Sequence, residues 1–443
     1  MSSYYDIDFT ELSLRYPELS RHFIADTNKY DLNSNDAIID LTKAILDYKF
    51  NLKINLNKNK LCPRIPNRLE YLKFIKELPL QSKQNDELYI IDVGTGHSVI
   101  YPLLGCRFFQ NCKFIGTDID QSSIQEAIEN VKLNNLDNRI KIYLNLANDD
   151  FFNLSKYGLM TNVNDVNNNI ITICNPPFYS SLQEIEAKKT AKFQIKKYYS
   201  PITQNEFVTI GGEYHFIVKM INESLQLKNK ITWYTSLVGN FSNLELLVKY
   251  LKQNNIPNYF VKALLPSNKF KNNKVTQRWI IGWCFHGLKI RNSIIYKNSP
   301  NLKKFNQINE FNIPLNSYWD LNQLIETSLN KLNYKGELYR IDDSKLEIQF
   351  PGNVWSRTFR RKFETHVNNR HPNDNDHNDN NDDDKDVHRG AVKRTKLQLA
   401  NDQDFTIFLI EMRKNSITIF WKYGFNYKIF ESFCGFIKRL VDG

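Results

Sequence analysis

The pattern of apolar and polar residues between positions 88 and 174 predicts strands that alternate with helices. Four apolar runs have the length of buried strands, at 88–93, 113–118, 139–144 and 170–174. Residues 121–134 have the helical period, and a further helix is expected around 102–105. Such alternation predicts an α/β fold with a parallel, doubly wound sheet of the Rossmann-like kind, and we assign it to residues 86–290.

Residues 1–85 predict a helical and basic N-terminal extension. Apolar positions at helical spacing indicate helices at 36–50 and 66–78. Nine basic residues lie between positions 43 and 76 of this extension: Lys43, Lys49, Lys53, Lys58, Lys60, Arg64, Arg68, Lys73 and Lys76. They form either a solvated face or one that contacts RNA, and the total charge favours RNA.

Residues 310–443 predict a small α+β domain. A helix is expected at 317–332, strands at 337–341, 346–350, 405–411 and 416–423, and a closing helix at 427–440. Residues 366–393 form an Asn/Asp-rich insert, which cannot build a core and is expected to be disordered.

Charge and composition narrow the class of partner. The net charge is +11, although residues 374–386 hold seven Asp and one Lys; taking away that local −6 leaves +17 on the rest. Such an excess makes a polyanion the leading partner, with nucleic acid ahead of a membrane surface. We expect neither a signal peptide nor a membrane span. Six scattered cysteines without a Cys-x-x-Cys pair indicate a reducing compartment and no metal site.

A glycine turn follows the first predicted strand. In Asp92-Val93-Gly94-Thr95-Gly96, the two glycines let the backbone approach a ligand, with the N–H groups of the next helix facing it. Asp118 ends the second strand, where a carboxylate can accept both ribose hydroxyls of a nucleoside. The third glycine of the dinucleotide fingerprint is missing, so the turn indicates a ligand site only together with the acid that ends the second strand and with Asn-Pro-Pro-Phe after the fourth.

The tetrapeptide Asn175-Pro176-Pro177-Phe178 follows the fourth strand. Two prolines end the strand and donate no N–H group, so carbonyl oxygens at this corner are left as acceptors. Asn175 adds an amide, and Phe178 a flat face. Acceptors beside an aromatic ring suit a planar base or amide that bears an exocyclic amine. The tetrapeptide taken alone is equally compatible with a turn that merely ends a strand.

Together these motifs resemble S-adenosylmethionine-dependent amino-group methyltransferases. More narrowly, the chain resembles the U6 small nuclear RNA adenine-N6 methyltransferases (methyltransferase-like sixteen) and their bacterial 23S ribosomal RNA relatives. The resemblance spans residues 8–286 and includes further blocks: Tyr16-Pro17, Pro66-x-Arg68, Asn134-Asn135-Leu136, Gly211-Gly212-Glu213, Trp233-Tyr234 and Arg278-Trp279.

The resemblance implies S-adenosylmethionine as cofactor and class I methyltransferase chemistry. It implies that Arg68 contacts the methionine carboxylate and Asp118 the ribose, at a place where Glu is familiar. The other implied cofactor contacts are Gly94, Thr95, Gly96, Ser98 and Asn175. His97 is expected to be a neighbour of the cofactor. In the relatives a Lys-Thr pair gates cofactor entry; here Asn148-Asp149 takes its place, which puts such gating in doubt.

Two basic clusters predict RNA contacts. The loop 186–200 interleaves five lysines with Phe193, Tyr198 and Tyr199, and this composition suits phosphate contacts and base stacking: Lys188, Lys189, Lys192, Lys196 and Lys197. A solvated loop is the alternative. Arg278 belongs to a second cluster, which precedes the strand-like run 279–285. The nearby tryptophans, Trp233, Trp279 and Trp283, are expected in the core.

The function predicted from the sequence is adenine-N6 methylation of a structured RNA, with U6 small nuclear RNA as the target that the resemblance implies. Asn175, Pro176, Pro177 and Phe178 are the expected catalytic residues. N5-methylation of a protein glutamine and RNA binding without turnover are the alternatives. A nuclear location is expected, with the cytoplasm as alternative, and Lys393-Arg394-x-Lys396 is a candidate signal. The sequence defines no oligomeric state.

Overall fold

The chain divides into two compact units, residues 1–307 and 308–443. The computed structural model describes residues 9–24, 29–31, 34–81, 87–146, 148–159, 169–177, 209–264, 277–296, 299–315, 319–325, 337–358 and 405–442. The segments 1–85 and 86–290, which the sequence treats as separate parts, both belong to the first unit. Within the described residues, no helix is long and apolar enough to cross a bilayer.

Four parallel strands form one half of the sheet in the first unit. They are β3 (Leu88–Val93), β4 (Cys112–Asp118), β5 (Ile140–Leu144) and β6 (Asn169–Cys174), in the order β5-β4-β3-β6. The strands β3 and β6 are almost completely buried, which is why their sequences are continuous apolar runs. The predicted parallel α/β sheet is confirmed.

Three antiparallel strands continue the sheet beyond β6. They are β7 (Tyr234–Val238), β8 (Asn258–Leu264) and β9 (Arg278–Cys284), in the order β7-β9-β8. A parallel bridge between Ile171 and Trp233 joins the two halves, and Thr172 N donates to Trp233 O at 2.8 Å. The sequence pattern indicated β9 but not β7 or β8.

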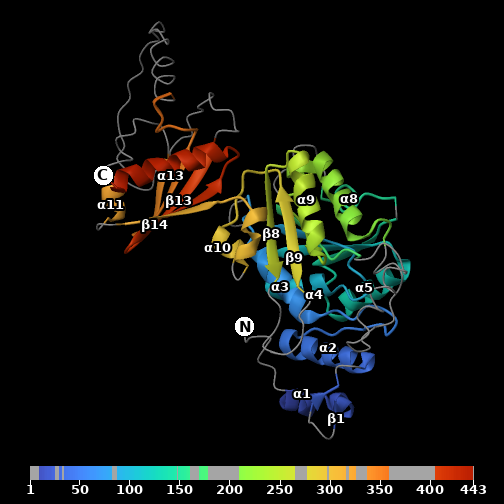
Figure 1. Cartoon of the computed structure of the whole chain (residues 1–443). Helices are drawn as coiled ribbons and strands as arrows, with labels where there is room; N and C mark the ends of the chain where they lie inside the picture. The colour runs from blue at the N-terminus through green and yellow to red at the C-terminus, as the bar shows by residue number, and fades with distance from the viewer. Residues whose placement is uncertain are drawn as a thin grey trace, which may run out of the picture. The chain divides into compact units, whose positions relative to one another are not determined.

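Helices cover both faces of this sheet (Figure 1). The helices α8 (Gly212–Leu227) and α9 (Phe241–Gln253) pack on one face. The helices α3 (Ile65–Lys76), α4 (Ile100–Phe108) and α5 (Gln121–Leu133) confirm three predicted helices. Gly105 of α4 lies so close to the Phe114 ring of β4 that a β-carbon would overlap it. This close approach fixes the helix that follows the glycine turn.

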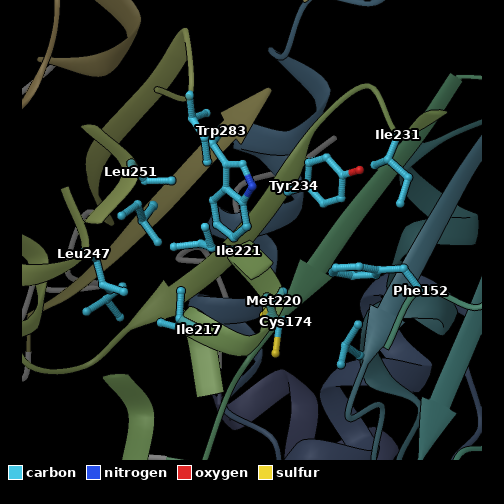
Figure 2. Packing of buried hydrophobic residues seen from close by; sticks show 14 of the residues in the cluster. Phe152, Cys174, Ile217, Met220, Ile221, Ile231, Tyr234, Leu247, Leu251 and Trp283 are labelled. Atoms are coloured by element: carbon cyan, nitrogen blue, oxygen red, sulfur yellow. The ribbon is translucent and has the colours of Figure 1, made fainter. Parts of the chain in front are cut away.

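Figure 2 shows the core between β6, β7, β9 and the helices α8 and α9. The rings of Tyr234 and Trp283 stack at 5.8 Å, with Met220 and Ile221 of α8 beside them. Trp283 Nε1 donates to Ser224 Oγ at 2.9 Å, so its buried polar atom has a partner. Trp233 and Trp283 are core residues as predicted, and the partly buried Trp279 packs against the same cluster.

The N-terminal extension is only partly helical. It contains α1 (Phe9–Arg15), the 3-10 helix η1 (Pro17–His22), the short strands β1 (Phe23–Ile24) and β2 (Lys29–Tyr30), and α2 (Asn35–Phe50). The predicted helix at 36–50 is confirmed, and Ser34 caps it by accepting from Ala37 N. Residues 51–64 are not helical but run without regular structure towards α3.

Three short helical turns complete the first unit: η2 (Lys228–Lys230), α10 (Asn292–Ile295) and η3 (Pro300–Phe305). Leu302 and Phe305 of η3 join the core cluster that α8 and α9 form with the sheet.

The second unit is a five-stranded antiparallel sheet with a long helix across it (Figure 1). The strand order is β10-β14-β13-β12-β11, and α13 covers one face with Ile429, Phe430, Phe433 and Ile437. Buried and partly buried residues alternate along β12, which is why its sequence alternates between apolar and polar residues and predicts a strand. The bounds are β10 (Glu310–Pro314), α11 (Leu321–Leu324), β11 (Glu337–Asp342), β12 (Lys345–Phe350), β13 (Thr406–Arg413), β14 (Ser416–Tyr423) and α13 (Tyr427–Asp442).

The four predicted strands and the closing helix of this unit are confirmed, and β10 was not predicted. Of the helix predicted at 317–332, the structure describes residues 319–325, of which 321–324 form α11. The insert 366–393 lies outside the described residues.

Candidate active site

A pocket lies where the parallel strands β3, β4 and β6 end. The carboxyl ends of parallel strands meet at one edge of the sheet, so residues far apart in sequence come together there. The loops after the strands contribute Gly94, Asp118 and Asn175, and the segment before α3 contributes Leu61 and Pro63. All seven residues predicted to hold the cofactor line this pocket: Arg68, Gly94, Thr95, Gly96, Ser98, Asp118 and Asn175.

The glycine turn forms the floor of the pocket. Gly94 and Gly96 have φ angles of +73° and +65°, which side-chain-bearing residues rarely adopt. A β-carbon at either position would meet no atom within 4 Å, so the backbone there faces open space. Gly94 N and Thr95 N both donate to Thr117 O at 2.9 Å, which fastens the turn to β4. The turn therefore offers bare backbone to a ligand.

Asp118 at the end of β4 is held by backbone N–H groups. Its Oδ2 accepts from Gly96 N at 2.9 Å, and its Oδ1 accepts from Asp120 N at 3.0 Å. Burial raises the pKa of Asp118, and these hydrogen bonds oppose the rise. Each carboxylate oxygen keeps a second lone pair, which leaves Asp118 able to accept ribose hydroxyls.

Asp92 lies beneath the turn and is almost completely buried. Thr95 Oγ1 donates to its Oδ2 at 2.7 Å, whereas its Oδ1 has no partner among the described residues. Burial raises the pKa of Asp92 to about 7, against the hydrogen bond from Thr95 and the charge of Arg68. Asp92 therefore supports the turn from below.

Arg68 brings a positive charge from α3 to the pocket. Its guanidinium lies 5.1 Å from the ring centroid of Tyr101, and its buried Nε has no partner among the described residues. A partly buried guanidinium with an unpaired N–H group is a ready partner for a carboxylate. A cation for the methionine carboxylate, a glycine turn and a carboxylate for the ribose fit S-adenosylmethionine.

The expected catalytic residues lie beside these cofactor residues. Asn175 and Pro177 line the pocket, whereas Pro176 is buried next to them and Phe178 lies outside the described residues. Asn175 is half-buried and lines the pocket, so its side chain lies where a ligand can reach it. Cys174, directly before it, is fully buried and anchors this corner in the core.

Some pocket residues were not predicted from the sequence. Asn145 follows β5; its N donates to Asp118 O at 2.8 Å and its Nδ2 to Tyr157 Oη at 2.7 Å. The rings of Phe151 and Phe216 also line the pocket, 4.7 Å apart. Phe216 follows the Gly211-Gly212-Glu213 motif by three residues, which is the one signal that could have indicated it.

Glu213 of that motif is buried and caps the loop after β7. Its carboxylate accepts from Gly239 N, Asn240 N and Asn243 Nδ2. Burial raises the pKa of Glu213 despite these bonds. Arg278 Nη1 donates to Gly239 O at 3.3 Å in the same loop. Arg278 therefore supports a loop at the edge of the sheet, and its RNA contact stays a prediction.

The other predicted RNA contacts are the lysines of the loop 186–200 and the basic residues of the N-terminal extension, of which Lys58 and Lys60 differ most in environment. The five lysines at 188–197 lie outside the described residues. Lys58 is exposed and forms an ion pair with Asp36 at 2.9 Å. Lys60 was expected on a solvated or RNA-contacting face, and this expectation is wrong, because Lys60 is only 4% exposed and its ammonium contacts carboxylates and hydroxyls. Charge by itself does not tell a surface lysine from a buried, paired one.

The pair Asn148-Asp149, which was expected at the place of a cofactor-gating pair, does not line the pocket. Asp149 Oδ2 accepts from Leu146 N at 2.9 Å and from Lys156 Nζ at 3.3 Å. No group of three or more metal-ligating side chains occurs in the part of the chain that the structure describes.

Known proteins are similar to this chain in sequence and in structure. A protein-family model for RNA methyltransferases matches residues 2–287. The U6 small nuclear RNA (adenine-(43)-N(6))-methyltransferase of Schizosaccharomyces pombe is 30% identical over 93% of this chain and 95% of its own length. The RNA N(6)-adenosine-methyltransferase METTL16 of Homo sapiens is 29% identical over 63% of this chain and 48% of its own length.

A solved structure agrees with the sequence comparisons. The hMettl16 catalytic domain in complex with the MAT2A 3′UTR hairpin 1 superimposes with a TM-score of 0.54 and 26% identity, over 63% of this chain and 92% of that chain. The match to the family model covers the whole pocket, from Leu61 to Phe216. This chain therefore belongs to the RNA methyltransferase family, and it is an enzyme that uses S-adenosylmethionine as methyl donor.

Proposed function

We propose that this protein methylates N6 of an adenosine in U6 small nuclear RNA. The observation that carries the proposal is the pocket, in which Asn175 and Pro177 lie together with Arg68, the glycine turn and Asp118. The similarity to the S. pombe U6 enzyme over nearly the full length of both chains supports the target. The excess of positive charge supports a polyanionic substrate.

The cofactor half of the pocket binds S-adenosylmethionine through three contacts. The guanidinium of Arg68 pairs with the methionine carboxylate, the backbone of Gly94, Thr95, Gly96 and Ser98 follows the chain of the ligand, and Asp118 accepts the ribose hydroxyls. When bound, S-adenosylmethionine supplies an electrophilic methyl group. The residues of the chain orient it and exclude water.

The acceptor half holds the exocyclic amine of adenine. This amine is a weak nucleophile because its lone pair is delocalised into the ring. The Asn175 amide oxygen and the Pro176 carbonyl accept its two hydrogens and favour a tetrahedral nitrogen, while Phe178 stacks on the flipped base. Transfer then depends on proximity and orientation rather than on a dedicated base.

The comparisons favour RNA over a protein glutamine as substrate, because the matched family model and the S. pombe and human relatives are RNA methyltransferases. A U6 substrate supports a nuclear location, which imaging of the tagged protein tests directly. RNA binding without turnover is disfavoured by the full set of cofactor residues in the pocket.

The test is methyl transfer to a U6 RNA oligonucleotide, followed by mass spectrometry of N6-methyladenosine. The wild-type chain is expected to methylate this RNA and not a copy in which the target adenosine is guanosine. Asn175→Ala is expected to lose about a hundred- to a thousandfold in kcat, as removal of an oriented catalytic donor or acceptor does, while it still binds S-adenosylmethionine because Arg68 and Asp118 remain. Turnover at the wild-type rate in Asn175→Ala contradicts the proposed role. Methylation of a glutamine-bearing peptide instead of the RNA contradicts the proposed substrate.

A further inference from the structure

The segment of residues 52–60 runs along helix α5 and is fastened to it by side chains. Lys53 exchanges two hydrogen bonds with the Asn134 amide, at 2.9 and 2.7 Å. Asn55 exchanges two with the Asn130 amide, at 2.7 and 3.0 Å. Asn57 Nδ2 donates to Glu126 Oε1 at 3.0 Å. Residues 53, 55 and 57 of the segment are thus bonded to residues 134, 130 and 126, so that a step of two residues along the segment matches a step of four along α5 and its C-terminal cap.

This spacing has a geometric reason. Two residues of extended chain span about 6.6 Å, and four residues of α-helix rise about 6 Å, so an extended segment can stay in register along a helix. Asn130 Nδ2 also donates to His97 O in the glycine turn, at 3.1 Å. The register therefore fixes the segment relative to the pocket, where the next residues, Leu61 and Pro63, line the wall.

Lys60 ends the segment and is buried at the start of α5. Its ammonium contacts Ser122 Oγ at 2.6 Å, Ser123 Oγ at 2.9 Å, Glu126 Oε1 at 3.1 Å and Asp120 Oδ2 at 3.3 Å. A buried ammonium is stable only when such partners satisfy it, and removing it leaves two carboxylates close together without a cation.

Asp120 connects this ammonium to the ribose carboxylate. Its side chain caps α5 by accepting from Ser123 N at 3.0 Å, and its backbone N donates to Asp118 Oδ1 at 3.0 Å. The position of Asp120 therefore sets one of the two hydrogen bonds that orient Asp118.

We propose that Lys60 is a positioning residue for S-adenosylmethionine binding, which acts by holding Asp120 so that Asp118 is oriented for the ribose before the cofactor arrives. The proposal rests on the role of Asp118 given under the proposed function. Lys60 itself does not line the pocket, so its effect on the cofactor is transmitted through Asp120. Without the ammonium, Asp120 and Glu126 repel each other and the first turn of α5 moves, which misaligns the donor to Asp118.

The test uses the full chain with Lys60→Met, which keeps the length of the side chain and removes its charge. Loss of the oriented bond is expected to raise the Kd for S-adenosylmethionine, measured by calorimetry, by about ten- to hundredfold. The kcat at saturating cofactor is expected to stay within about threefold, because Asn175 and its corner are untouched. Lys60→Arg, which keeps the charge, is expected to restore part of the affinity.

Lys58→Met is the matched control. Lys58 lies two residues earlier on the same segment, but its ammonium is exposed and pairs with Asp36 of α2. Its removal is expected to leave the Kd for S-adenosylmethionine unchanged. An equal loss of affinity in Lys58→Met and Lys60→Met overturns the proposal, because it indicates a general effect of charge on the segment.

A double-mutant cycle with Asp118→Asn separates positioning from a structural role. If Lys60 acts through Asp118, the double variant binds little more weakly than Asp118→Asn alone; if the two effects on affinity simply add, the proposal is overturned. Loss of affinity in Asp118→Asn with none in Lys60→Met refutes only the role of Lys60. Unchanged affinity in Asp118→Asn refutes the ribose assignment itself.

Ser122→Ala keeps the test decisive if Lys60→Met does not unfold cooperatively. Ser122 is exposed, and its replacement removes the 2.6 Å hydrogen bond to Lys60 without stranding a charge. The Kd is expected to rise by about two- to fivefold, the equivalent of one ordinary hydrogen bond. An unchanged Kd in Ser122→Ala then overturns the proposal.

Discussion

Asp118→Asn tests the geometry of the cofactor site most directly. The exchange keeps the size of the side chain and replaces one oxygen by an NH2 group. Both carboxylate oxygens accept a backbone hydrogen bond, one from Gly96 N at 2.9 Å and one from Asp120 N at 3.0 Å. Whichever way the amide is turned, its NH2 group faces one of these N–H groups. The variant therefore always replaces one hydrogen bond by a contact between two donors.

The size of the effect follows from this arrangement. A buried N–H group left without an acceptor costs about 1–3 kcal/mol, which lowers the free energy of unfolding by that amount. Burial raises the pKa of Asp118, which means that the folded chain disfavours its charge. The neutral amide does not carry this penalty, so the free energy of unfolding is expected to fall by an amount near the lower end of that range. Binding of S-adenosylmethionine is weakened separately, because the ribose hydroxyls lose a charged acceptor. This loss is expected to cost about 1.5–3 kcal/mol of binding free energy, which raises the Kd about ten- to hundredfold.

Two measurements separate the two effects. Urea unfolding gives the change in stability, and calorimetry with S-adenosylmethionine gives the change in Kd. Asp149→Asn is the control, because Asp149 also accepts a backbone hydrogen bond, from Leu146 N at 2.9 Å, but does not line the pocket. Its Kd is expected to match the wild type. A wild-type Kd in Asp118→Asn as well refutes the assignment of Asp118 to the ribose.

Three further predictions concern stability. Burial raises the pKa of Asp92 to about 7 from its ordinary 3.8, so between these values the folded chain keeps a proton that the unfolded chain has lost. The melting temperature is expected to fall as the pH rises from about 4 to 7, and Asp92→Asn to reduce this dependence; an equal slope in both proteins contradicts the reasoning. Gly105→Ala forces a β-carbon into the Phe114 ring and is expected to lower the free energy of unfolding by about 1–3 kcal/mol in urea titrations. Trp283→Ala removes the ring that stacks on Tyr234 and is expected to cost about 3–5 kcal/mol; an unchanged denaturation midpoint argues against a core role.

The sequence predicted a feature correctly where its burial or its backbone conformation depends on a few neighbouring residues. The buried strands β3 and β6 are continuous apolar runs, and the positive φ angles of Gly94 and Gly96 require glycine. The same holds for β12 of the second unit, in which the alternation of apolar and polar residues matches the burial pattern. Once the parallel sheet is inferred, its topology places Asp118 and Asn175 at one edge.

Other features depend on contacts between distant parts of the chain. Lys60 was counted with the surface cations because a basic residue in a basic segment gives no local sign of burial; its carboxylate partners are 60 and 66 residues away. Phe151 and Phe216 become neighbours because α8 contacts the segment that follows β5, where Phe151 N donates to Glu223 Oε2 at 2.7 Å. Strands β7 and β8 were not predicted because polar residues interrupt their apolar pattern. In β7 the hydroxyls of Thr235 and Ser236 are buried and bonded to Thr172 O and Leu237 O, and β8 contains Asn258 and Lys262.

The amino-acid sequence by itself determined the alternating α/β architecture, the glycine turn with its carboxylate, and the Asn-Pro-Pro corner, because each depends on residue periodicity or backbone conformation over a short stretch. Tertiary structure alone decided that Leu61 and Pro63 of the N-terminal segment line the pocket and that Lys60 is buried against the start of α5. The physical reason is that an ionised side chain becomes stable in the interior only when its partners are brought to it, and the fold as a whole brings them there.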